Sequence, residues 1–236
     1  MTAAAAEALP ASIRAVIFDA GGTLIHIDGE RVCDAAGVPF EAERFRDAES
    51  AAVAAVRAFM LERRDSKDAE RVLFYFDHML ARLGLADARA RGEAGARVAA
   101  EHRRANLWSR AGAGAAETLA ALAARRYRMA VVSNADGRVR GLLEDAGVIP
   151  WLEFVVDSHE VGLEKPDPRI FHAATDRLGL DPSACAYVGD IYEIDVEGAR
   201  RAGLHPILIG EGPAPDGVLR IRELSGLLPL LPGFLR

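Results

Sequence analysis

The sequence predicts an α/β fold: a doubly wound parallel β-sheet whose chain is interrupted by an inserted all-helical domain. Three observations support this fold class. Short, nearly continuous apolar runs recur along the chain, amphipathic helical segments separate them, and residues 27–107 show helical periodicity without a convincing strand. Strands that alternate with helices at this spacing are typical of parallel sheets.

Five apolar runs are the predicted strands of the sheet. Each is short and apolar on both alternating faces, as expected for a strand that is buried on both sides. The runs span residues 14–19, 127–134, 153–158, 185–190 and 205–210. The amphipathic helices expected around them span residues 115–126, 137–147, 168–180 and 196–203.

The inserted helical domain separates the first predicted strand from the second. Its helical patterns span residues 40–64, 70–85 and 88–108. The predicted organisation is therefore residues 1–26 as the first part of the sheet domain, 27–107 as the helical domain and 108–236 as the second part. Residues 1–12 are interpreted as a frayed cytosolic leader, and residues 227–236 as a packed tail.

Composition excludes several classes of protein. Half of the 236 residues are apolar, which is enough for a sizeable core, and the net charge of −6 argues against a general nucleic-acid binder. The two cysteines, Cys33 and Cys185, are too few for a disulfide scaffold and favour a reducing compartment. No apolar stretch approaches the length of a membrane span. We expect a cytoplasmic monomer or homodimer without nucleic-acid or membrane partners.

Polar residues gather where the predicted strands end. The first strand ends at Asp19, the second at Ser133 and Asn134, and the fourth at Asp190, with Asp195 five residues further on. Because open parallel sheets bind ligands beyond the carboxyl ends of their strands, these side chains are expected to converge on one crevice.

Lys165 is expected to reach the same crevice from the loop after the third strand. Only two of the 29 basic residues are lysines, Lys67 and Lys165, and all the others are arginines. Because lysine is so rare in this chain, we interpret Lys165 as a candidate site residue.

The expected cluster has a coherent chemistry. Asp19 and Asp190 supply the hard oxygen ligands that Mg²⁺ prefers, and Ser133 with the amides near Asn134 can hold phosphate oxygens. Lys165 adds positive charge beside the phosphoryl group. Asp19 can then attack phosphorus and form an aspartyl-phosphate.

Four segments resemble the four sequence motifs of the haloacid dehalogenase (HAD) superfamily. They occur in the family's order and at family-like spacing, and together they span Asp19 to about Gly203; the segments are FDAGGTL, VVSN, EKPDP and YVGDIYEIDVEGARRAG. The resemblance implies a Rossmann-like core, with the helical insert as a C1-type cap that carries the substrate specificity.

The resemblance also implies a role for each matching residue. Asp19 corresponds to the nucleophile and metal ligand, Ser133 to the phosphate-binding hydroxyl, Lys165 to the motif-three lysine and Asp190 to the motif-four metal ligand. Asn134 is expected to help bind the substrate. Asp195, with Thr23, is expected to support the metal site.

Gly21 departs from the pattern of the family's phosphatases. Those enzymes carry an aspartate two residues after the nucleophile, which protonates the leaving group and later activates water. Gly21 keeps the backbone carbonyl that contacts the metal, so metal binding is expected to survive. Loss of general acid–base catalysis typically costs about a hundredfold to ten-thousandfold in rate. The nearest replacement acids in the sequence are His26, Asp28 and Glu30.

Mg²⁺-dependent hydrolysis of a small phosphorylated metabolite is the leading hypothesis. A metal-independent dehalogenase is an alternative, because the family's dehalogenases also lack the second aspartate, although Asp190 stands where a metal ligand belongs. A phosphonate hydrolase would need a cap lysine, for which Lys67 in a polar segment is the candidate. A binding protein of the same fold without turnover remains the non-enzymatic alternative.

Each site residue also has a purely structural alternative. Asp19 can cap a turn, Asn134 and Asp136 can begin a helix, Lys165 can be a solvated loop residue and Asp195 can cap a helix. The coincidence of four motifs in register favours the functional interpretation over these alternatives.

Overall fold

The computed structural model describes residues 9–63, 66–211 and 217–231 and contains two compact units. One unit comprises the described residues up to His26 together with those from Arg110 onward, and the other spans Ile27–Ser109. The predicted leader lies mostly outside the described residues, as does the end of the predicted C-terminal tail.

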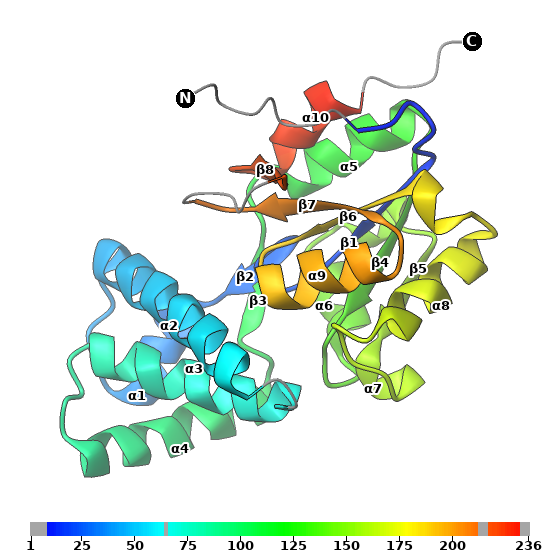
Figure 1. Cartoon of the computed structure of the whole chain (residues 1–236). Helices are drawn as coiled ribbons and strands as arrows, with labels where there is room; N and C mark the ends of the chain where they lie inside the picture. The colour runs from blue at the N-terminus through cyan, green and yellow to red at the C-terminus, as the bar shows by residue number, and fades with distance from the viewer. Residues whose placement is uncertain (1–8, 64–65, 212–216, 232–236) are drawn as a thin grey trace, which may run out of the picture. The chain divides into compact units, whose positions relative to one another are not determined.

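The first unit is built on a six-stranded sheet in the order β5-β4-β1-β6-β7-β8 (Figure 1). Every neighbouring pair is parallel. The strands are β1 (Ala15–Phe18), β4 (Arg128–Ser133), β5 (Phe154–Asp157), β6 (Cys185–Gly189), β7 (His205–Ile209) and β8 (Leu219–Ile221). The predicted doubly wound parallel sheet is confirmed, and β8 is an additional strand that the sequence analysis did not identify.

The centre of the sheet is fully apolar. All four residues of β1 are buried, and β1 pairs with β4 on one side and with β6 on the other. The run from Ala15 to Phe18 therefore has no polar face, because both of its faces lie against covering layers.

Helices cover both faces of this sheet. On one face α8 (Pro168–Leu178) and α9 (Glu197–Arg201) bury Phe171, Ala174 and Ala199 against the strands. On the other side lie α5 (Ala115–Ala124) and α10 (Leu227–Leu230) (Figure 1). The short helices α6 (Val139–Asp145) and α7 (Ser158–Val161) flank β5.

Local sequence signals explain why α8 begins and ends where it does. Asp167 caps the helix by accepting a hydrogen bond from the Arg169 amide, and Pro168 occupies the first turn, where no amide hydrogen is needed. Gly179 ends the helix with a left-handed φ of 64°. The segment before α9 differs from prediction, because a π-helical turn (Tyr192–Val196) precedes the short α-helix.

Among the described residues of the second unit, helices are the only regular elements apart from a strand at each end. The unit contains α1 (Gly29–Ala36), α2 (Ala42–Glu62), α3 (Asp68–Arg82) and α4 (Ala88–Arg104). Helix α3 packs on both α2 and α4, and α1 packs on α4. Three of these helices match the predicted ones, whereas α1 was not anticipated.

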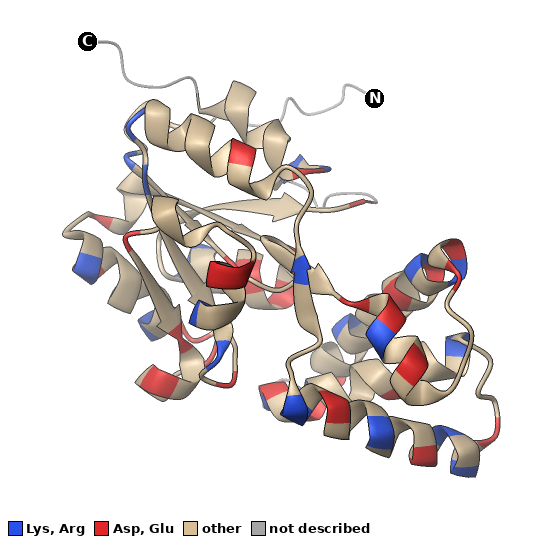
Figure 2. Cartoon of the chain, turned by 180° about the vertical axis from the view of Figure 1, so that it is seen from behind, with Lys and Arg blue, Asp and Glu red and all other residues tan. Residues whose placement is uncertain are grey.

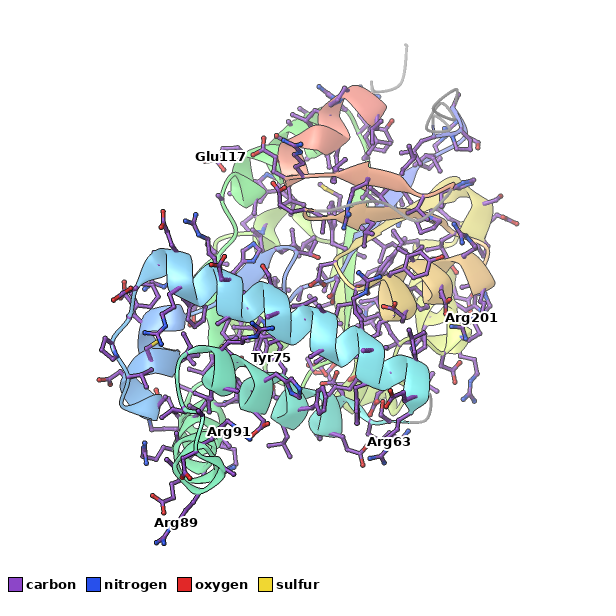
Figure 3. All side chains as sticks on the ribbon, turned by 60° about the vertical axis from the view of Figure 1, so that its left-hand side comes forward. Arg63, Tyr75, Arg89, Arg91, Glu117 and Arg201 are labelled. Carbon is purple, nitrogen blue, oxygen red and sulfur yellow. The ribbon has the colours of Figure 1, made fainter. Side chains whose placement is uncertain are left out.

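Several aromatic side chains are buried in the helical unit, and most of its charged side chains lie on the surface, although Arg71 of α3 is buried. Tyr75 is buried among the helices, whereas Arg89 is exposed and points outward from α4 (Figure 3). Lysine, arginine, aspartate and glutamate residues recur along the helices of this unit (Figure 2). No helix within the described ranges combines the length and apolar character that crossing a bilayer requires.

A two-stranded sheet carries both connections between the units. It pairs β2 (Ile25–Ile27) with β3 (Trp108–Ala111). The sequence analysis predicted neither strand, because each has at most four residues and lacks a clear apolar pattern. Arg31 of α1 secures the unit near these strands by donating to Glu101, the Ala105 carbonyl and Ser109.

Two helical glycines offer a matched test of the packing on α9. A Cβ added at Gly198 would lie 2.7 Å from a ring carbon of Phe171, whereas nothing lies within 4 Å of one added at Gly141 in α6. We expect Gly198→Ala to lower the free energy of unfolding by about 1–3 kcal/mol, because the core is overpacked. Gly141→Ala should raise it by about 0.5–1 kcal/mol through helix propensity. Urea unfolding of both variants checks this, and equal shifts would contradict the packing described.

Candidate active site

The candidate site lies where the sheet reverses its winding direction. The chain runs from β1 outward to β4 and β5, then returns to β6 beside β1 and continues to β7 and β8. Ligands of doubly wound sheets bind at such a switch point, beyond the carboxyl ends of the strands. Asp19 directly follows β1 and Asp190 directly follows β6. The Asp19 amide also donates to the Val188 carbonyl at 2.8 Å, which ties the two strand ends together.

Three carboxylates meet at this point. Asp19, Asp190 and Asp195 each offer an oxygen atom, and these oxygens lie within 4.8 Å of one another. Asp19 is 8% exposed and Asp195 only 1%. Asp19 and Asp195 are thus largely shielded from bulk water, whereas Asp190 is partly exposed.

The π-helical turn brings Asp195 back towards the end of β6. Its Oδ2 atom accepts a hydrogen bond from the Ile191 amide at 2.9 Å, and its own amide donates to the Ile191 carbonyl at 2.7 Å. Gly189 leaves the necessary space, since a Cβ there would lie 2.6 Å from Asp195 Oδ2. Asp195 therefore does more than cap a helix, because its side chain folds against the site.

Lys165 lies at the centre of the charged cluster. Its side chain is 2% exposed, and Nζ lies 2.7 Å from Asp19 Oδ1 and 2.8 Å from Asp195 Oδ1. A third contact joins Nζ to the hydroxyl oxygen of Tyr187 at 2.9 Å. An ammonium group has three hydrogens to donate, so each of them has an acceptor. Lys165 is not a solvated loop residue.

Asn134 holds the backbone of Lys165. Its side-chain Oδ1 accepts from the Lys165 amide at 2.7 Å, and its Nδ2 donates to the Lys165 carbonyl at 3.0 Å. The side chain expected to bind substrate thus braces the loop that carries the lysine. The role of Asn134 in substrate binding stays a prediction. The backbone amides near Asn134 are still able to bind the substrate.

Ser133 is placed to offer its hydroxyl to a ligand. The residue is 3% exposed and ends β4 beside the other strand ends. Among the described residues, its hydroxyl makes only a marginal hydrogen bond, which it donates to the Asn134 carbonyl at 3.5 Å. A hydroxyl that is held so weakly retains its capacity to donate a strong hydrogen bond.

The glycine turn after Asp19 lets Asp190 approach closely. Gly22 has a left-handed φ of 74°, and a Cβ there would lie 2.6 Å from Asp190 Cγ. Gly21 is not among the glycines with positive φ, and it forms an isolated bridge with Ile25. Thr23 follows, and its hydroxyl is buried without a hydrogen-bond partner.

Burial and mutual repulsion disturb the acidity of the site. Burial raises the pKa of Asp19 to about 6, although Lys165 opposes the shift. Burial, followed by the charges of Asp195 and Asp19, raises the pKa of Asp190 well above its usual range. Burial would lower the pKa of Lys165, but Asp19 and Asp195 outweigh it and raise that pKa. Three carboxylates beside one ammonium favour a further cation.

The donor set fits Mg²⁺. Among the described residues, the buried Asp190 Oδ1 has no hydrogen-bond partner, and Asp190 belongs to a cluster of hard carboxylate ligands. Magnesium is typically bound by one or two carboxylates together with water and substrate phosphate. The orphaned oxygen is therefore the feature that a bound cation would satisfy.

The residues considered as replacement acids or as a Schiff-base lysine are not described as part of the carboxylate cluster. Asp28 caps α1 by accepting from the Arg31 amide at 3.2 Å, and Glu30 is exposed. His26 lies between two buried isoleucines in β2, but its own side chain is exposed. Lys67 is exposed at the start of α3, which does not supply the desolvation that a Schiff-base lysine needs.

Tyr187 also belongs to the site, although the sequence did not predict it as a site residue. Its signal was a single polar side chain in an otherwise apolar strand, CAYVG, at a position buried in the sheet. A strand pattern alone cannot show that this hydroxyl meets a lysine from a distant loop.

Comparison with known proteins identifies the family. A family model for haloacid dehalogenase-like hydrolases matches residues 13–203. The chain is 40% identical over 125 residues to haloacid dehalogenase-like hydrolase domain-containing protein 3 of Bos taurus, covering 50% of this chain and 49% of that protein. It is 43% identical over 70 residues to the glyceraldehyde 3-phosphate phosphatase of Methanopyrus kandleri, covering 30% of each.

Solved structures agree with this assignment. A crystal structure of a dehalogenase superposes with a TM-score of 0.65 at 25% sequence identity, covering 94% of this chain and 99% of that one. The chain spans about half the length of the curated relatives it matches first. With its parallel sheet, four motifs and carboxylate cluster, the chain belongs to the haloacid dehalogenase-like hydrolase family.

The crowded carboxylates predict a pH dependence of stability in metal-free buffer. A carboxyl group whose pKa is raised on folding binds more protons in the folded state, so stability falls as pH rises. For Asp19 this window runs from the ordinary value of 3.8 to about 6. Asp190→Asn removes one of the repelling charges. We expect it to gain stability over the unsubstituted chain as pH rises, by at most about 1.4 kcal/mol per pH unit for each proton involved.

Urea unfolding with a chelator between pH 4.5 and 7.5 measures the difference between the two chains. Parallel profiles would show that Asp190 does not repel its neighbours in the folded state.

Proposed function

We propose that this chain is a Mg²⁺-dependent phosphatase that acts on a small phosphorylated molecule through Asp19. The observation that carries the proposal is the cluster of Asp19, Asp190 and Asp195, in which Asp190 Oδ1 is buried without a partner. Similarity to a phosphatase that acts on glyceraldehyde 3-phosphate supports the same reaction class.

The proposed metal ligands are the side chains of Asp19 and Asp190 and the backbone carbonyl of Gly21. Asp195 supports them by holding Lys165, and Thr23 lies in the same turn as Gly21. When bound, the cation neutralises charge on the phosphoryl group and on the carboxylate that approaches it. The raised pKa of Asp19, about 6, still leaves its carboxyl group largely ionised at neutral pH.

Asp19 is the proposed nucleophile. One of its carboxylate oxygens attacks phosphorus, the bond between phosphorus and the ester oxygen breaks, and an aspartyl-phosphate forms. Lys165, 2.7 Å from Asp19 Oδ1, offsets negative charge at that carboxylate. Ser133 donates its hydroxyl hydrogen to a phosphoryl oxygen. Attack of water on phosphorus then releases phosphate and restores the Asp19 carboxylate.

Gly21 limits the proposed reaction. No carboxylate stands two residues after the nucleophile, so leaving groups that need a proton are expected to react slowly. Substrates with acidic leaving groups escape this restriction. We further propose that the helical unit Ile27–Ser109 serves as the cap that selects the substrate, because it is inserted through β2 and β3 close in sequence to Asp19.

Dehalogenation is the second candidate function. Gly21 favours it, since a halide leaves without a proton, and a dehalogenase structure is 25% identical to this chain. In that reaction Asp19 would attack carbon and expel the halide without a metal. The buried, unpaired Asp190 Oδ1 favours the phosphatase over this alternative.

Product release distinguishes the two functions. Phosphate release from a panel of phosphorylated metabolites and aryl phosphates, with and without Mg²⁺, is measured beside halide release from 2-haloacids. We expect phosphate release that requires Mg²⁺ and disappears in Asp19→Asn. Halide release that persists in a chelator would instead support the dehalogenase.

Gly21→Asp tests the missing proton donor. The variant adds a carboxylate and keeps the backbone carbonyl, and Gly21 is not a positive-φ position that an aspartate would strain. We expect kcat on an alkyl phosphate to rise by about a hundredfold, with a smaller rise on an aryl phosphate.

Gly22→Asp is the matched control, because the same charge is added one residue later at a φ of 74° against Asp190. It should give no gain. An equal gain on both esters in Gly21→Asp would show that the new carboxylate does not act as a proton donor.

A further inference from the structure

Tyr187 is a buried tyrosine in the middle of β6, and its hydroxyl contacts the charged cluster. The hydroxyl accepts from Lys165 Nζ at 2.9 Å and donates to the Val132 carbonyl at 3.0 Å. Asp195 Oδ1 lies 3.2 Å away as a second acceptor. The residue is 0% exposed, so none of these contacts is made through bulk water.

The ring and the hydroxyl of Tyr187 have separate surroundings. The ring packs edge-on against Phe171, with centroids 4.9 Å apart, and this contact needs no oxygen. A phenylalanine would fill the same space. A buried hydroxyl, by contrast, is tolerated only where it finds hydrogen-bond partners, and here those partners are Lys165, Val132 and Asp195.

The Lys165 ammonium needs the tyrosine to complete its contacts. Two of its three hydrogens are accepted by Asp19 and Asp195, and the third by Tyr187. The single hydroxyl hydrogen of Tyr187 can be donated to the Val132 carbonyl or to Asp195, and in either case a lone pair remains available to Lys165. Tyr187 lies in β6 and is hydrogen-bonded to β4 through Val132. Its hydroxyl therefore gives the Lys165 ammonium, which comes from a loop, a contact that is fixed to the central sheet.

We propose that Tyr187 is a positioning residue that fixes the Lys165 ammonium against Asp19. Its effect on catalysis rests on the proposed function, whereas its effect on Lys165 does not. During phosphoryl transfer Asp19 gives up its negative charge to a covalent bond and becomes a weaker partner for the ammonium. Tyr187 and Asp195 then keep Lys165 beside the transferred group.

The two-lysine composition makes a direct test possible. Lysine labelled with ¹⁵N gives two side-chain ammonium signals, one from exposed Lys67 and one from buried Lys165. We expect Tyr187→Phe to shift the Lys165 signal and to speed the reaction of Lys165 with an amine reagent by about tenfold to a hundredfold, because a charge-assisted hydrogen bond is lost. Lys67 should be unchanged and serves as the internal reference.

Tyr127→Phe is the matched control. Tyr127 is 7% exposed and directly precedes β4, at the opposite end of that strand from Ser133. It should leave the Lys165 signal and its reactivity unchanged. If Tyr187→Phe behaves like Tyr127→Phe, the hydroxyl only fills the core and the positioning role is overturned.

Steady-state kinetics provide a second test of the positioning role of Tyr187. We expect Tyr187→Phe to lower kcat for phosphate release by about tenfold to a hundredfold with little change in KM. The same substitution should cause no further loss in a Lys165→Met background, because the two residues act through one contact. Additive losses would overturn the positioning role. A change at Lys165 without any phosphate release from the unsubstituted chain would count against the proposed function and leave the positioning contact standing.

A measurement on the unsubstituted chain covers the case in which Tyr187→Phe does not fold. A nuclear Overhauser effect is expected between the Lys165 ammonium hydrogens and the hydrogens of the Tyr187 ring. Its absence, with the Lys165 signal resolved, would overturn the proposal.

Discussion

The buried ion pair between Lys165 and Asp19 is the interaction on which the candidate site depends. Lys165 Nζ also contacts Asp195, so one ammonium connects the ends of β1 and β6 with the loop that precedes α8. Breaking a buried ion pair by removing one partner typically costs about 3–5 kcal/mol, because the other charge is left without compensation. Here three carboxylates would be left. Lys165 is therefore central to the local structure, and we propose that the chemistry at Asp19 also depends on it.

The site concentrates negative charge beyond what Lys165 can balance. Asp190 can lie close to the turn after Asp19 because Gly22 has no side chain. Asp195 can lie close to the end of β6 because Gly189 has no side chain. Burial raises the pKa values of Asp19 and Asp190, and the charge of Asp195 raises both further. Keeping these carboxyl groups ionised in the metal-free fold therefore costs free energy. Strained or repelling groups are commonly retained at functional sites. The arrangement is understandable if a cation and a phosphoryl group are what the site binds.

The sequence revealed the elements that repeat a strong pattern and missed those that depend on contacts. Buried parallel strands leave continuous apolar runs, so β1, β4, β5, β6 and β7 were predicted, and their ends located Asp19, Ser133 and Asp190. Strands β2 and β3 are too short to show a period, and α1 is a two-turn helix in a part of the helical domain where no helical pattern was identified. The bracing role of Asn134 and the contact of Tyr187 with Lys165 arise between residues more than 20 positions apart, which no local pattern records.

The proposed reaction requires that Asp19 becomes covalently phosphorylated during turnover. Rapid acid quenching during turnover of an aryl phosphate, followed by mass spectrometry of the peptides, locates any phosphoryl group directly. We expect one phosphoryl group on the peptide that contains Asp19, and turnover in ¹⁸O-labelled water should place the label in the released phosphate. Label found in the Asp19 carboxylate itself would contradict the proposed phosphatase, because it would mean that water attacks the carbonyl carbon of an ester intermediate, as in dehalogenation.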